Sequence, residues 1–346
     1  MASLARMDRH NDYRVYCLDR AAPAVFPDAP NVRCQVLWPE MRVISTMWSL
    51  PWALMSQGVD LLHATFTPPP LSPKPYVFTH HCFSTFQHPE FYAPAILLRL
   101  NALIKQGLKH ARRIICVSEN VRLLTAEHFN IPLERMTVVH NGVGDHFVPI
   151  DTTWAQAEVA RRFGIHGPYL LYTGKLESRK NIVRLLEAFK AFREETRDPV
   201  TLALAGRRTP MSEGIDEALD RLCLRDAVAE LGHLDIAELP LLYSAATMFV
   251  FPSLWEGFGI PVIEAMACGT PVLTSNLSSL PEVAGDAAVL VDPYKVDDIA
   301  GGILRLWRDG DLRDQLRQRG LARTSSFSWD ETARKTMAVY RDVHAS

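Results

Sequence analysis

Short apolar runs alternate with segments of helical period along almost the whole chain, and this alternation is the strongest constraint on its fold. Runs rich in β-branched and aromatic side chains lie at 13–18, 60–64, 76–81, 113–118, 136–140, 169–174, 201–206, 228–233, 248–253, 271–275 and 288–292. Between them, segments such as 182–189 place apolar residues at helical spacing. Buried strands alternating with crossover helices predict an α/β protein whose parallel sheets carry helices on both faces.

The length of 346 residues favours two domains, because a domain usually holds ~100–200 residues. The alternation stops over the polar stretch 149–168, so we place the boundary there. We expect a Rossmann-like domain over 1–150, a second over 165–327 and a final helix over 328–346. Ligands of such sheets bind at the carboxyl ends of the strands.

Composition excludes several classes of protein. Hydrophobic residues make up 48 % of the chain and charged residues 22 %, which is typical of a globular enzyme. A net charge of -2 offers no broad basic surface, so we expect no nucleic-acid partner. The six cysteines are scattered without a C-x-x-C pair, and residues 1–11 are polar. These features indicate a cytoplasmic chain with reduced thiols and no signal peptide.

The most apolar stretch, 43–55, is interrupted by Pro51 and is shorter than the ~20 residues that span a bilayer. We interpret it as an amphipathic helix packed against its own domain. Trp48 and Trp52 leave an alternative open, in which this helix makes a peripheral contact with the inner face of a membrane.

The segment YTGKLESRKNIVRLLEAF (172–189) concentrates positive charge where a helix is expected to begin. A strand should end at Gly174, and Ser178 suits the N-cap of the following helix. Lys175, Arg179 and Lys180 in such a first turn oppose the helix dipole. A bound phosphate would explain them, whereas a solvated basic turn is the alternative.

The segment WEGFGIPVIEAMACGTPV (255–272) places two carboxylates, Glu256 and Glu264, around a glycine-rich corner. Gly257 and Gly259 allow the backbone to approach a ligand closely. Pro261 suits the first position of a helix whose amides face that ligand. Because a carboxylate accepts paired hydrogen bonds from vicinal hydroxyls, the pattern predicts amides for a phosphate, one carboxylate for a hexose and the other for a ribose.

These motifs resemble the retaining glycosyltransferases of family 4. The pattern Glu256-x7-Glu264 is followed by AMACGTPV and by SSLPEVAGDAAVLVDP (278–293). The resemblance continues through VSE (117–119), HNGV (140–143), LGHLDIAELPLLYSAA (231–246) and FSWDETARKTMAVYRDV (327–343). It implies the GT-B fold, in which two Rossmann-like domains face each other across a cleft and the terminal helix returns to the first domain. It also implies a nucleotide-diphosphate sugar as donor, without a metal or other cofactor.

The resemblance implies roles for individual residues. Glu256 would hold hydroxyls of the donor sugar, and Lys175 and Lys180 would neutralise the leaving diphosphate; the family usually has arginine at position 175. Together with His81 these form the expected catalytic set. Expected donor-binding residues are Gly174, Arg179, Leu234, Gly257, Phe258, Gly259, Ile260 and Glu264, with Glu264 on the ribose. No D-x-D metal-binding signature appears in a fitting context.

In the first half, VFTHHCFSTFQHPEFY (77–92) resembles the T-x-H-D segment of the family. Thr79 and His81 match it, which would put His81 near the reacting sugar, whereas Cys82 stands where aspartate is common. A packing role for His81 is the alternative. A metal site built from His80, His81, Cys82 and His88 is disfavoured, because adjacent strand residues point to opposite faces.

Family members normally open with a strand, a Gly-Gly loop and a long helix. Here MASLARMDRHNDYRVYCLD (1–19) resembles the end of that helix and the second strand, so we expect a smaller N-terminal sheet. The start is misassigned or truncated, or the protein works without the loop.

The sequence thus predicts a retaining transferase that moves a hexosyl group, of the mannose or glucose type, from a GDP- or UDP-sugar to a hydroxyl of a glycan or lipid-linked acceptor. Two alternatives stay open: a non-catalytic pseudo-glycosyltransferase that binds a nucleotide sugar, and a nucleotide-sugar epimerase or hydrolase of the same fold.

Overall fold

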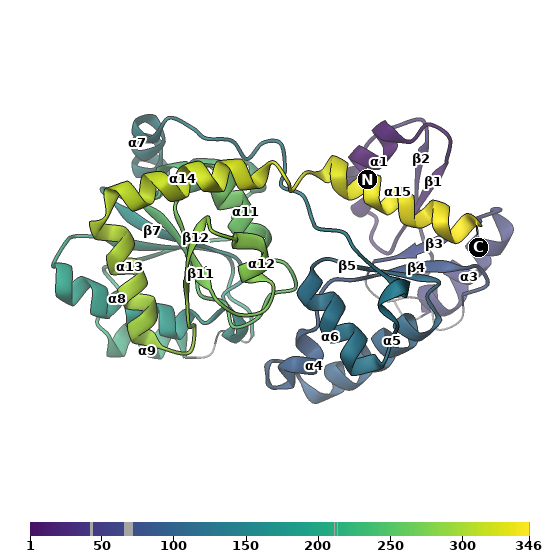
Figure 1. Ribbon diagram of the computed structural model, residues 1–346, viewed down its shortest axis with the longest axis horizontal. Helices are drawn as coiled ribbons and strands as arrows, with labels where there is room; N and C mark the ends of the chain where they lie inside the picture. The colour runs from purple at the N-terminus through teal and green to yellow at the C-terminus, as the bar shows by residue number, and fades with distance from the viewer. Residues whose placement is uncertain (42–43, 66–71, 211, 213, 346) are drawn as a thin grey trace. The chain divides into compact units, whose positions relative to one another are not determined.

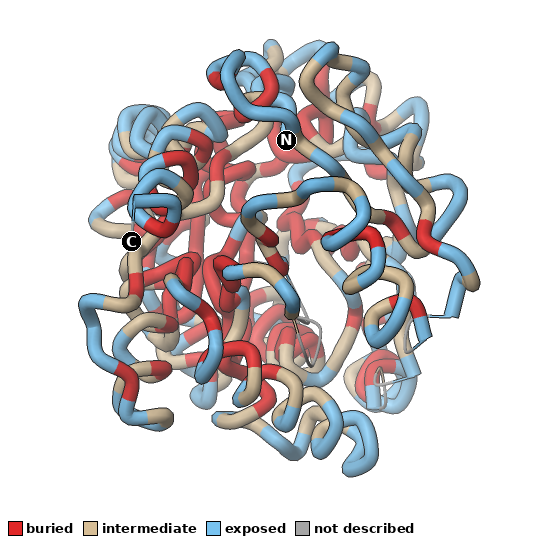
Figure 2. Tube along the Cα trace, turned by 90° about the vertical axis from the view of Figure 1, so that its right-hand side faces the viewer, coloured by how far each residue is buried: buried red, intermediate tan, exposed pale blue. Residues whose placement is uncertain are grey.

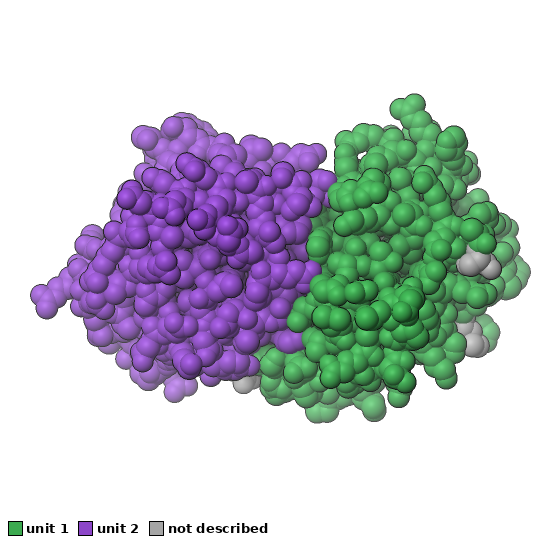
Figure 3. Space-filling view, viewed as in Figure 1, with its two compact units in different colours: residues 1–142, 329–346 green, residues 143–328 purple. Residues whose placement is uncertain are grey.

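The structure, a computed structural model, describes residues 1–41, 44–65, 72–210, 212 and 214–345. The chain forms two compact units, residues 1–142 with 329–346 (unit 1) and residues 143–328 (unit 2), which Figure 3 distinguishes by colour. The polar stretch at 149–168, where we expected the boundary, contains helix α7 (Thr152–Phe163) and belongs to unit 2. The side chain of Asp151 caps α7 by accepting from the Trp154 amide at 2.9 Å, so its polar residues mark a helix start and not a linker.

Unit 2 contains a six-stranded sheet, and each of the six apolar runs predicted there forms one of its strands. All neighbouring strands are parallel, in the order β12-β11-β10-β7-β8-β9. The strands are β7 (Tyr169–Thr173), β8 (Thr201–Ala205), β9 (Val228–Gly232), β10 (Met248–Phe251), β11 (Val272–Ser275) and β12 (Ala288–Val291). Residues of β7, β10 and β11 are buried throughout, as in a sheet that helices cover on both faces (Figures 1 and 2).

The helices of unit 2 connect these strands. Besides α7 they are α8 (Ile182–Thr196), α9 (Ile215–Arg221), α10 (Leu239–Ala245), α11 (Ile260–Ala267), α12 (Leu280–Ala284), α13 (Val296–Arg308) and α14 (Gly310–Thr324), with short 3-10 turns at η5 (Ser178–Lys180) and η6 (Ile236–Glu238). From β7 the chain passes through β8 to β9, then returns to β10 on the other side of β7. The loops that leave β7 and β10 therefore diverge, and such a switch point in the strand order is where open α/β sheets bind ligands.

Unit 1 contains two separate parallel sheets. Four strands form the order β3-β4-β5-β6, and β1 pairs with β2 alone among the strands that the structure describes. The strands are β1 (Tyr13–Cys17), β2 (Val32–Val36), β3 (Leu62–Ala64), β4 (Tyr76–His80), β5 (Arg113–Cys116) and β6 (Met136–Val138). β2 was not predicted, because VRCQV mixes charged and apolar residues and no residue of β2 is fully buried.

The helices of unit 1 include one from the far end of the chain. They are α1 (Ala2–Met7), α3 (Leu50–Ser56), α4 (Ser84–Gln87), α5 (Pro94–His110), α6 (Glu119–Phe129) and α15 (Trp329–Ala345), with short turns η1 (Ala22–Val25), η2 (Ser45–Ser49), η3 (Pro89–Phe91) and η4 (Leu133–Arg135). Val339 and Val343 of α15 pack against Val77 of β4 and Ile115 of β5. The same helix lies beside α1 (Figure 1), with Met337 against Leu4.

The segment that we interpreted as a core-packed helix forms the π turn η2 followed by α3; Val43 lies outside the described residues. Only Ser45, Ala53 and Leu54 of these two elements are buried. Trp48 and Trp52 are 72 % and 70 % exposed, so our interpretation is wrong for both side chains. Among the described residues, no helix is long and apolar enough to cross a membrane.

Two consecutive glycines of α13 provide a test of how this helix packs against the sheet of unit 2. A Cβ on Gly302 would lie 2.6 Å from Cδ1 of Leu273 and 2.8 Å from Cγ1 of Val291, whereas one on Gly301 would meet nothing within 4 Å. We expect Gly302→Ala to lower the free energy of unfolding by ~2 kcal/mol. Gly301→Ala should raise it by ~0.5–1 kcal/mol, since alanine favours the helix. Urea unfolding of the two variants checks this, and equal stability would contradict the packing.

Candidate active site in unit 2

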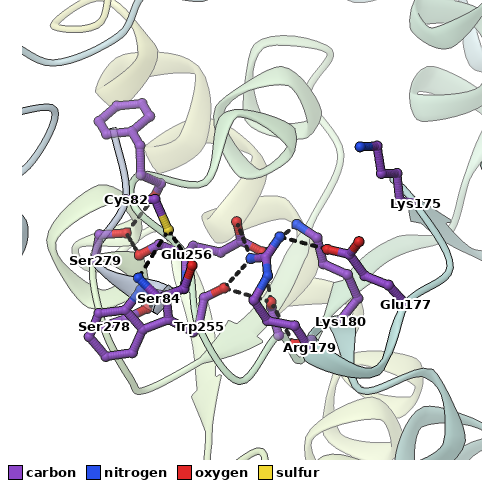
Figure 4. A network of polar contacts seen from close by, with 12 residues as sticks. Cys82, Ser84, Lys175, Glu177, Arg179, Lys180, Trp255, Glu256, Ser278 and Ser279 are labelled. Carbon is purple, nitrogen blue, oxygen red and sulfur yellow. Dashed lines mark hydrogen bonds and ion pairs between the residues drawn. The ribbon is translucent and has the colours of Figure 1, made fainter. Parts of the chain in front are cut away.

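A buried ion pair joins the loops that follow β7 and β10. Nζ of Lys180 lies 2.5 Å from Oε1 of Glu256, and the two residues are 9 % and 8 % exposed. The ammonium group also lies 5.0 Å from the ring centre of Phe251 at the end of β10. The Oγ of Ser253 donates to the same carboxylate oxygen at 2.7 Å. Figure 4 shows this network from close by.

Arg179 binds the other side of the Glu256 carboxylate. Its Nη1 lies 3.3 Å from Oε2 of Glu256 and donates to the Trp255 carbonyl at 2.5 Å. Its Nη2 lies 2.7 Å from Oε1 of Glu177. Two cations and two carboxylates thus form one compact cluster. The solvated basic turn that we kept as an alternative is therefore wrong for Arg179 and Lys180.

The cluster fixes the charge of Glu256. Burial alone would raise the pKa of this carboxyl, but Lys180 and Arg179 outweigh that effect and hold the pKa below its usual value. Burial lowers the pKa of Lys180, and Glu256 opposes part of that change. Because Oε1 of Glu256 accepts hydrogen bonds from Lys180 and Ser253 and Oε2 is paired with the charge of Arg179, the carboxylate is anionic and a poor nucleophile.

The helix expected at Ser178 begins later. Residues Ser178–Lys180 form the turn η5, and α8 begins at Ile182 after Asn181, whose φ of 64° is left-handed. The Asn181 side chain donates to the carbonyls of Pro252 at 3.1 Å and Pro293 at 2.7 Å. Asparagine tolerates this backbone conformation, and its amide ties the turn to the loop after β10. The turn therefore presents Arg179 and Lys180 to Glu256.

Gly174 occupies a position where two loops touch. Its φ is 131°, and a Cβ on the neighbouring Gly206 would lie 1.8 Å from its carbonyl oxygen. The close approach of the β7 and β8 loops therefore requires glycine at 206. Lys175 follows, is exposed, and stands apart from the cluster in Figure 4. The structure thus brings together two of the three predicted cations and leaves the third facing solvent.

Three serines hold the glutamate loop, and sequence reasoning assigned none of them a role. Ser253 contacts the carboxylate itself. The Oγ of Ser278 accepts from the Glu256 amide at 3.1 Å, and the Oγ of Ser279 donates to the carbonyls of Glu256 at 2.9 Å and Phe258 at 2.8 Å. The segment beginning SSLPEV, singled out only for its resemblance, therefore positions the loop. The sequence itself carries no signal of this role for either serine.

The glycine-rich corner leads directly into α11. Gly257, Phe258 and Gly259 are buried, and Phe258 packs edge-on against Phe327 with ring centres 5.6 Å apart. Gly259 has φ 111° and precedes the helix, which begins at Ile260. Pro261 is therefore the second helical residue and not the first. In the first turn of α11 Pro261 has no N–H, and the Val262 amide donates to the Gly259 carbonyl at 3.0 Å. This helix start lies at the carboxyl end of β10.

Glu264 lies inside α11 and is 9 % exposed. The Tyr243 hydroxyl lies 3.1 Å from its Oε2 and 2.7 Å from Oγ1 of Thr173 at the end of β7. Burial raises the pKa of Glu264 to about 7, although the bond from Tyr243 opposes the rise. This carboxyl therefore changes charge near neutral pH, unlike Glu256. Tyr243 and Thr173 are contacts that the sequence analysis missed.

Leu234, the remaining predicted donor contact, follows β9 and is half-buried. It precedes Asp235, which forms a capping box with Glu238. β9 is an edge strand, separated from β7 by β8. Leu234 therefore shares the carboxyl edge of the sheet but takes no part in the charged cluster.

In unit 1, three histidines have different surroundings. His80 is buried in β4 and bonds Thr125 at 2.9 Å, whereas His81 follows the strand and is exposed. The packing role considered for His81 therefore belongs to His80. The matched Thr79 bonds His63, which the sequence analysis missed, at 2.6 Å, and His63 also contacts Tyr340 of α15 at 2.5 Å.

The side chain of Cys82 contacts Ser84 Oγ at 2.9 Å. Among the described residues no three histidine, cysteine or acidic side chains are grouped as a metal site would need.

Two family models match the chain, one on each side of the boundary between the N-terminal part of unit 1 and unit 2. Residues 1–146 match the model of the domain described as Glycosyltransferase Family 4. Residues 160–323 match the model described as Glycosyl transferases group 1.

Individual proteins agree with these matches. The chain is 34 % identical over 265 residues to O-antigen chain mannosyltransferase B of Escherichia coli, covering 77 % of this chain and 70 % of that protein. Sucrose-phosphate synthase from Thermosynechococcus elongatus has a similar structure, with a TM-score of 0.81, 22 % identity and coverage of 99 % and 91 %. Alr3699/HepE of Anabaena, solved with UDP and glucose, gives a TM-score of 0.77 at 17 % identity, with coverage of 95 % and 91 %. The chain therefore belongs to the glycosyltransferases that combine a family 4 domain with a group 1 domain, and it has their GT-B fold.

Proposed function

We propose that this glycosyltransferase moves a hexosyl group from a nucleotide-diphosphate sugar to a hydroxyl of a glycan or lipid-linked acceptor, with retention of the anomeric configuration. The observation that carries the proposal is the buried Lys180–Glu256 pair at the switch point of the unit 2 sheet. Mannose is the favoured sugar, because the Escherichia coli relative is named a mannosyltransferase. That relationship also supports a cytoplasmic enzyme of surface-glycan synthesis and disfavours the non-catalytic and epimerase alternatives.

The donor diphosphate would lie between the cationic turn and the start of α11. Glu256 holds Lys180 and Arg179 in that turn. Lys175, a few residues earlier in the sequence, faces solvent. A helix start favours anions through its amides and dipole. As the bond to the sugar breaks, negative charge grows on the diphosphate, and fixed cations and amides stabilise that charge most. In this proposal side chains supply the positive charge, and the reaction needs no metal ion.

Glu256 would bind hydroxyls of the sugar and keep Lys180 in place. Its carboxylate is anionic, accepts hydrogen bonds from Lys180 and Ser253, and forms an ion pair with Arg179. Those bonds make a covalent glycosyl-enzyme through Glu256 unfavourable. We therefore favour attack by the acceptor on the face from which the diphosphate leaves, with a diphosphate oxygen taking the acceptor proton.

The remaining predicted contacts complete the donor and acceptor sides. Glu264 would accept from the ribose hydroxyls, and the backbone at Gly174, Gly257, Phe258, Gly259 and Ile260 would line the sugar and diphosphate. Leu234 would approach the nucleoside from the edge of the sheet. In unit 1, the exposed His81 at the end of β4 would assist at the reacting sugar.

The first test removes the charge of Glu256. We expect Glu256→Gln to lower transfer from GDP-mannose or UDP-glucose about a hundredfold or more, because the cluster loses the anion that orients its cations. It should also lower the free energy of unfolding by roughly 3 kcal/mol, since Lys180 stays buried with less compensation. The combined variant Glu256→Gln, Lys180→Met should regain stability but not transfer.

Glu187→Gln is the matched control, because Glu187 forms an exposed ion pair with Arg221 away from the cluster. Transfer in this control should equal that of the unchanged chain. Unchanged turnover in folded Glu256→Gln would contradict the proposed role of the cluster.

A second test uses the pKa of Glu264. With a pKa of about 7, this carboxyl is mostly protonated at pH 6 and mostly ionised at pH 8. Only the ionised form accepts from both ribose hydroxyls, so nucleotide affinity should rise ~tenfold across that range. Calorimetry should show a smaller rise in Glu264→Gln. The diphosphate of the nucleotide titrates in the same way with the unchanged chain and with Glu264→Gln. The ratio of the two affinities therefore reports the effect of the Glu264 carboxyl alone. A ratio that does not change with pH would refute the ribose contact.

A third test asks which base binds and whether metal is needed. GDP or UDP at 100 times its dissociation constant should stabilise the chain by ~2.7 kcal/mol. We expect one of the two nucleotides to raise the melting temperature equally with magnesium and with a chelator. Stabilisation that disappears in the chelator would overturn the metal-independent mechanism while leaving the nucleotide site intact.

A further inference from the structure

Unit 1 exposes a group of large apolar side chains on and beside one helical segment. We call this the tryptophan face: Trp38 (78 % exposed), Met41 (59 %), Met47 (50 %), Trp48 (72 %), Trp52 (70 %) and Met55 (57 %). Scattered exposed apolar residues are common, but large ones gathered on one short stretch of chain mark an interaction surface.

The local structure holds these side chains outward. Trp48, Trp52 and Met55 are spaced by four and three residues, which places them on one side of the helical segment. Ala53 and Leu54 occupy the buried side. The Oγ of Ser49 donates to the Trp38 carbonyl at 2.6 Å, so the preceding loop is tied to the same segment. Their exposure therefore follows from the backbone that anchors them.

The chemistry of the segment is unusual for a surface in water. From 44 to 56 it reads ISTMWSLPWALMS, without a charged residue. Exposed helix faces normally carry charged side chains. Tryptophan, by contrast, is favoured at the boundary between lipid and water, where its ring is apolar and its N–H remains hydrated.

Positive charge lies at one end of this segment. Gln57, which ends α3, accepts from Nη1 of Arg14 at 2.8 Å and donates to Gln35 at 2.7 Å. Arg14 of β1 lies opposite Arg33 of β2 in the register of that pair, and both are exposed. Because residues opposite each other share a face of a sheet, two guanidinium groups border the helix end. Such groups attract anionic phosphate headgroups.

We propose that the tryptophan face binds the surface of an anionic lipid bilayer, with its side chains at the headgroup boundary and Arg14 and Arg33 on the phosphates. The helical segment Ser45–Ser56 is about 18 Å long at 1.5 Å per residue, too short to span a bilayer, so it lies in the plane of the surface. A lipid-linked acceptor would be presented at the same surface. The binding itself does not depend on the proposed donor chemistry.

The size of the face favours a membrane over a second copy of the chain. A helix about 18 Å long and ~10 Å wide presents roughly 200 Å². A stable protein interface buries about 800 Å² on each partner. A membrane needs no complementary surface of that area, because each ring enters the boundary individually.

The experiment measures sedimentation of the full chain with vesicles of two parts phosphatidylcholine and one part phosphatidylglycerol, without nucleotide sugar. We expect the unchanged chain to bind and its tryptophan emission to shift to shorter wavelength. Trp48→Ser, Trp52→Ser should lower the partition coefficient at least about tenfold. The matched control is Trp154→Ser, because Trp154 is 54 % exposed on α7 in unit 2 and should not matter.

Arg14→Gln, Arg33→Gln should weaken binding to the anionic vesicles and leave the weaker binding to pure phosphatidylcholine unchanged. Failure of the unchanged chain to bind vesicles, or equal binding by the double tryptophan variant, would overturn the proposal. Self-association of the unchanged chain that the tryptophan variant abolishes, without vesicle binding, would assign the face to a second copy. Hexosyl transfer to a water-soluble acceptor should be the same in all these variants, which separates this test from that of the donor site.

Discussion

The arrangement of the charged cluster in unit 2 depends on one buried ion pair, Lys180 with Glu256. A buried charge is costly unless an opposite charge and hydrogen bonds compensate it, so each of these residues constrains the other. Their pairing ties the turn after β7 to the loop after β10, and Arg179 and Ser253 occupy the remaining carboxylate positions. Folding of unit 2 therefore also places the charged groups that the proposed chemistry uses.

The strand order makes this pairing available. β7 and β10 are sequence-distant neighbours, and the chain leaves them toward opposite sides of the sheet. The alternation of apolar runs was enough to predict the parallel sheet of unit 2. The same rules placed Glu256 and the cationic turn at that edge, because loops at the carboxyl ends of parallel strands lie together. Local pattern and fold agree here, since buried strands leave a continuous apolar signal.

What the sequence did not reveal depends on contacts between distant segments. Ser278 and Ser279 support the glutamate loop across more than twenty positions of sequence, and a serine in a polar segment carries no signal of such a role. The late start of α8 follows from Asn181 and its two distant carbonyl partners. The exposure of Trp48 was not predicted because apolar composition indicates burial. Only the fold shows which side of a helix is covered by its neighbours.

Unit 1 is built from two pieces of chain, residues 1–142 and 329–346, with unit 2 between them. Val339 and Val343 of α15 cover Val77 and Ile115, and Tyr340 bonds His63. During synthesis Val77, Ile115 and His63 leave the ribosome before unit 2, and α15 leaves it only after the whole of unit 2 has been made. Since chains grow at ~5–20 residues per second, the β4–β5 surface stays uncovered for many seconds. Unit 2 is continuous and can fold in that interval, so the order of translation favours a folded unit 2 before unit 1 can complete its own core.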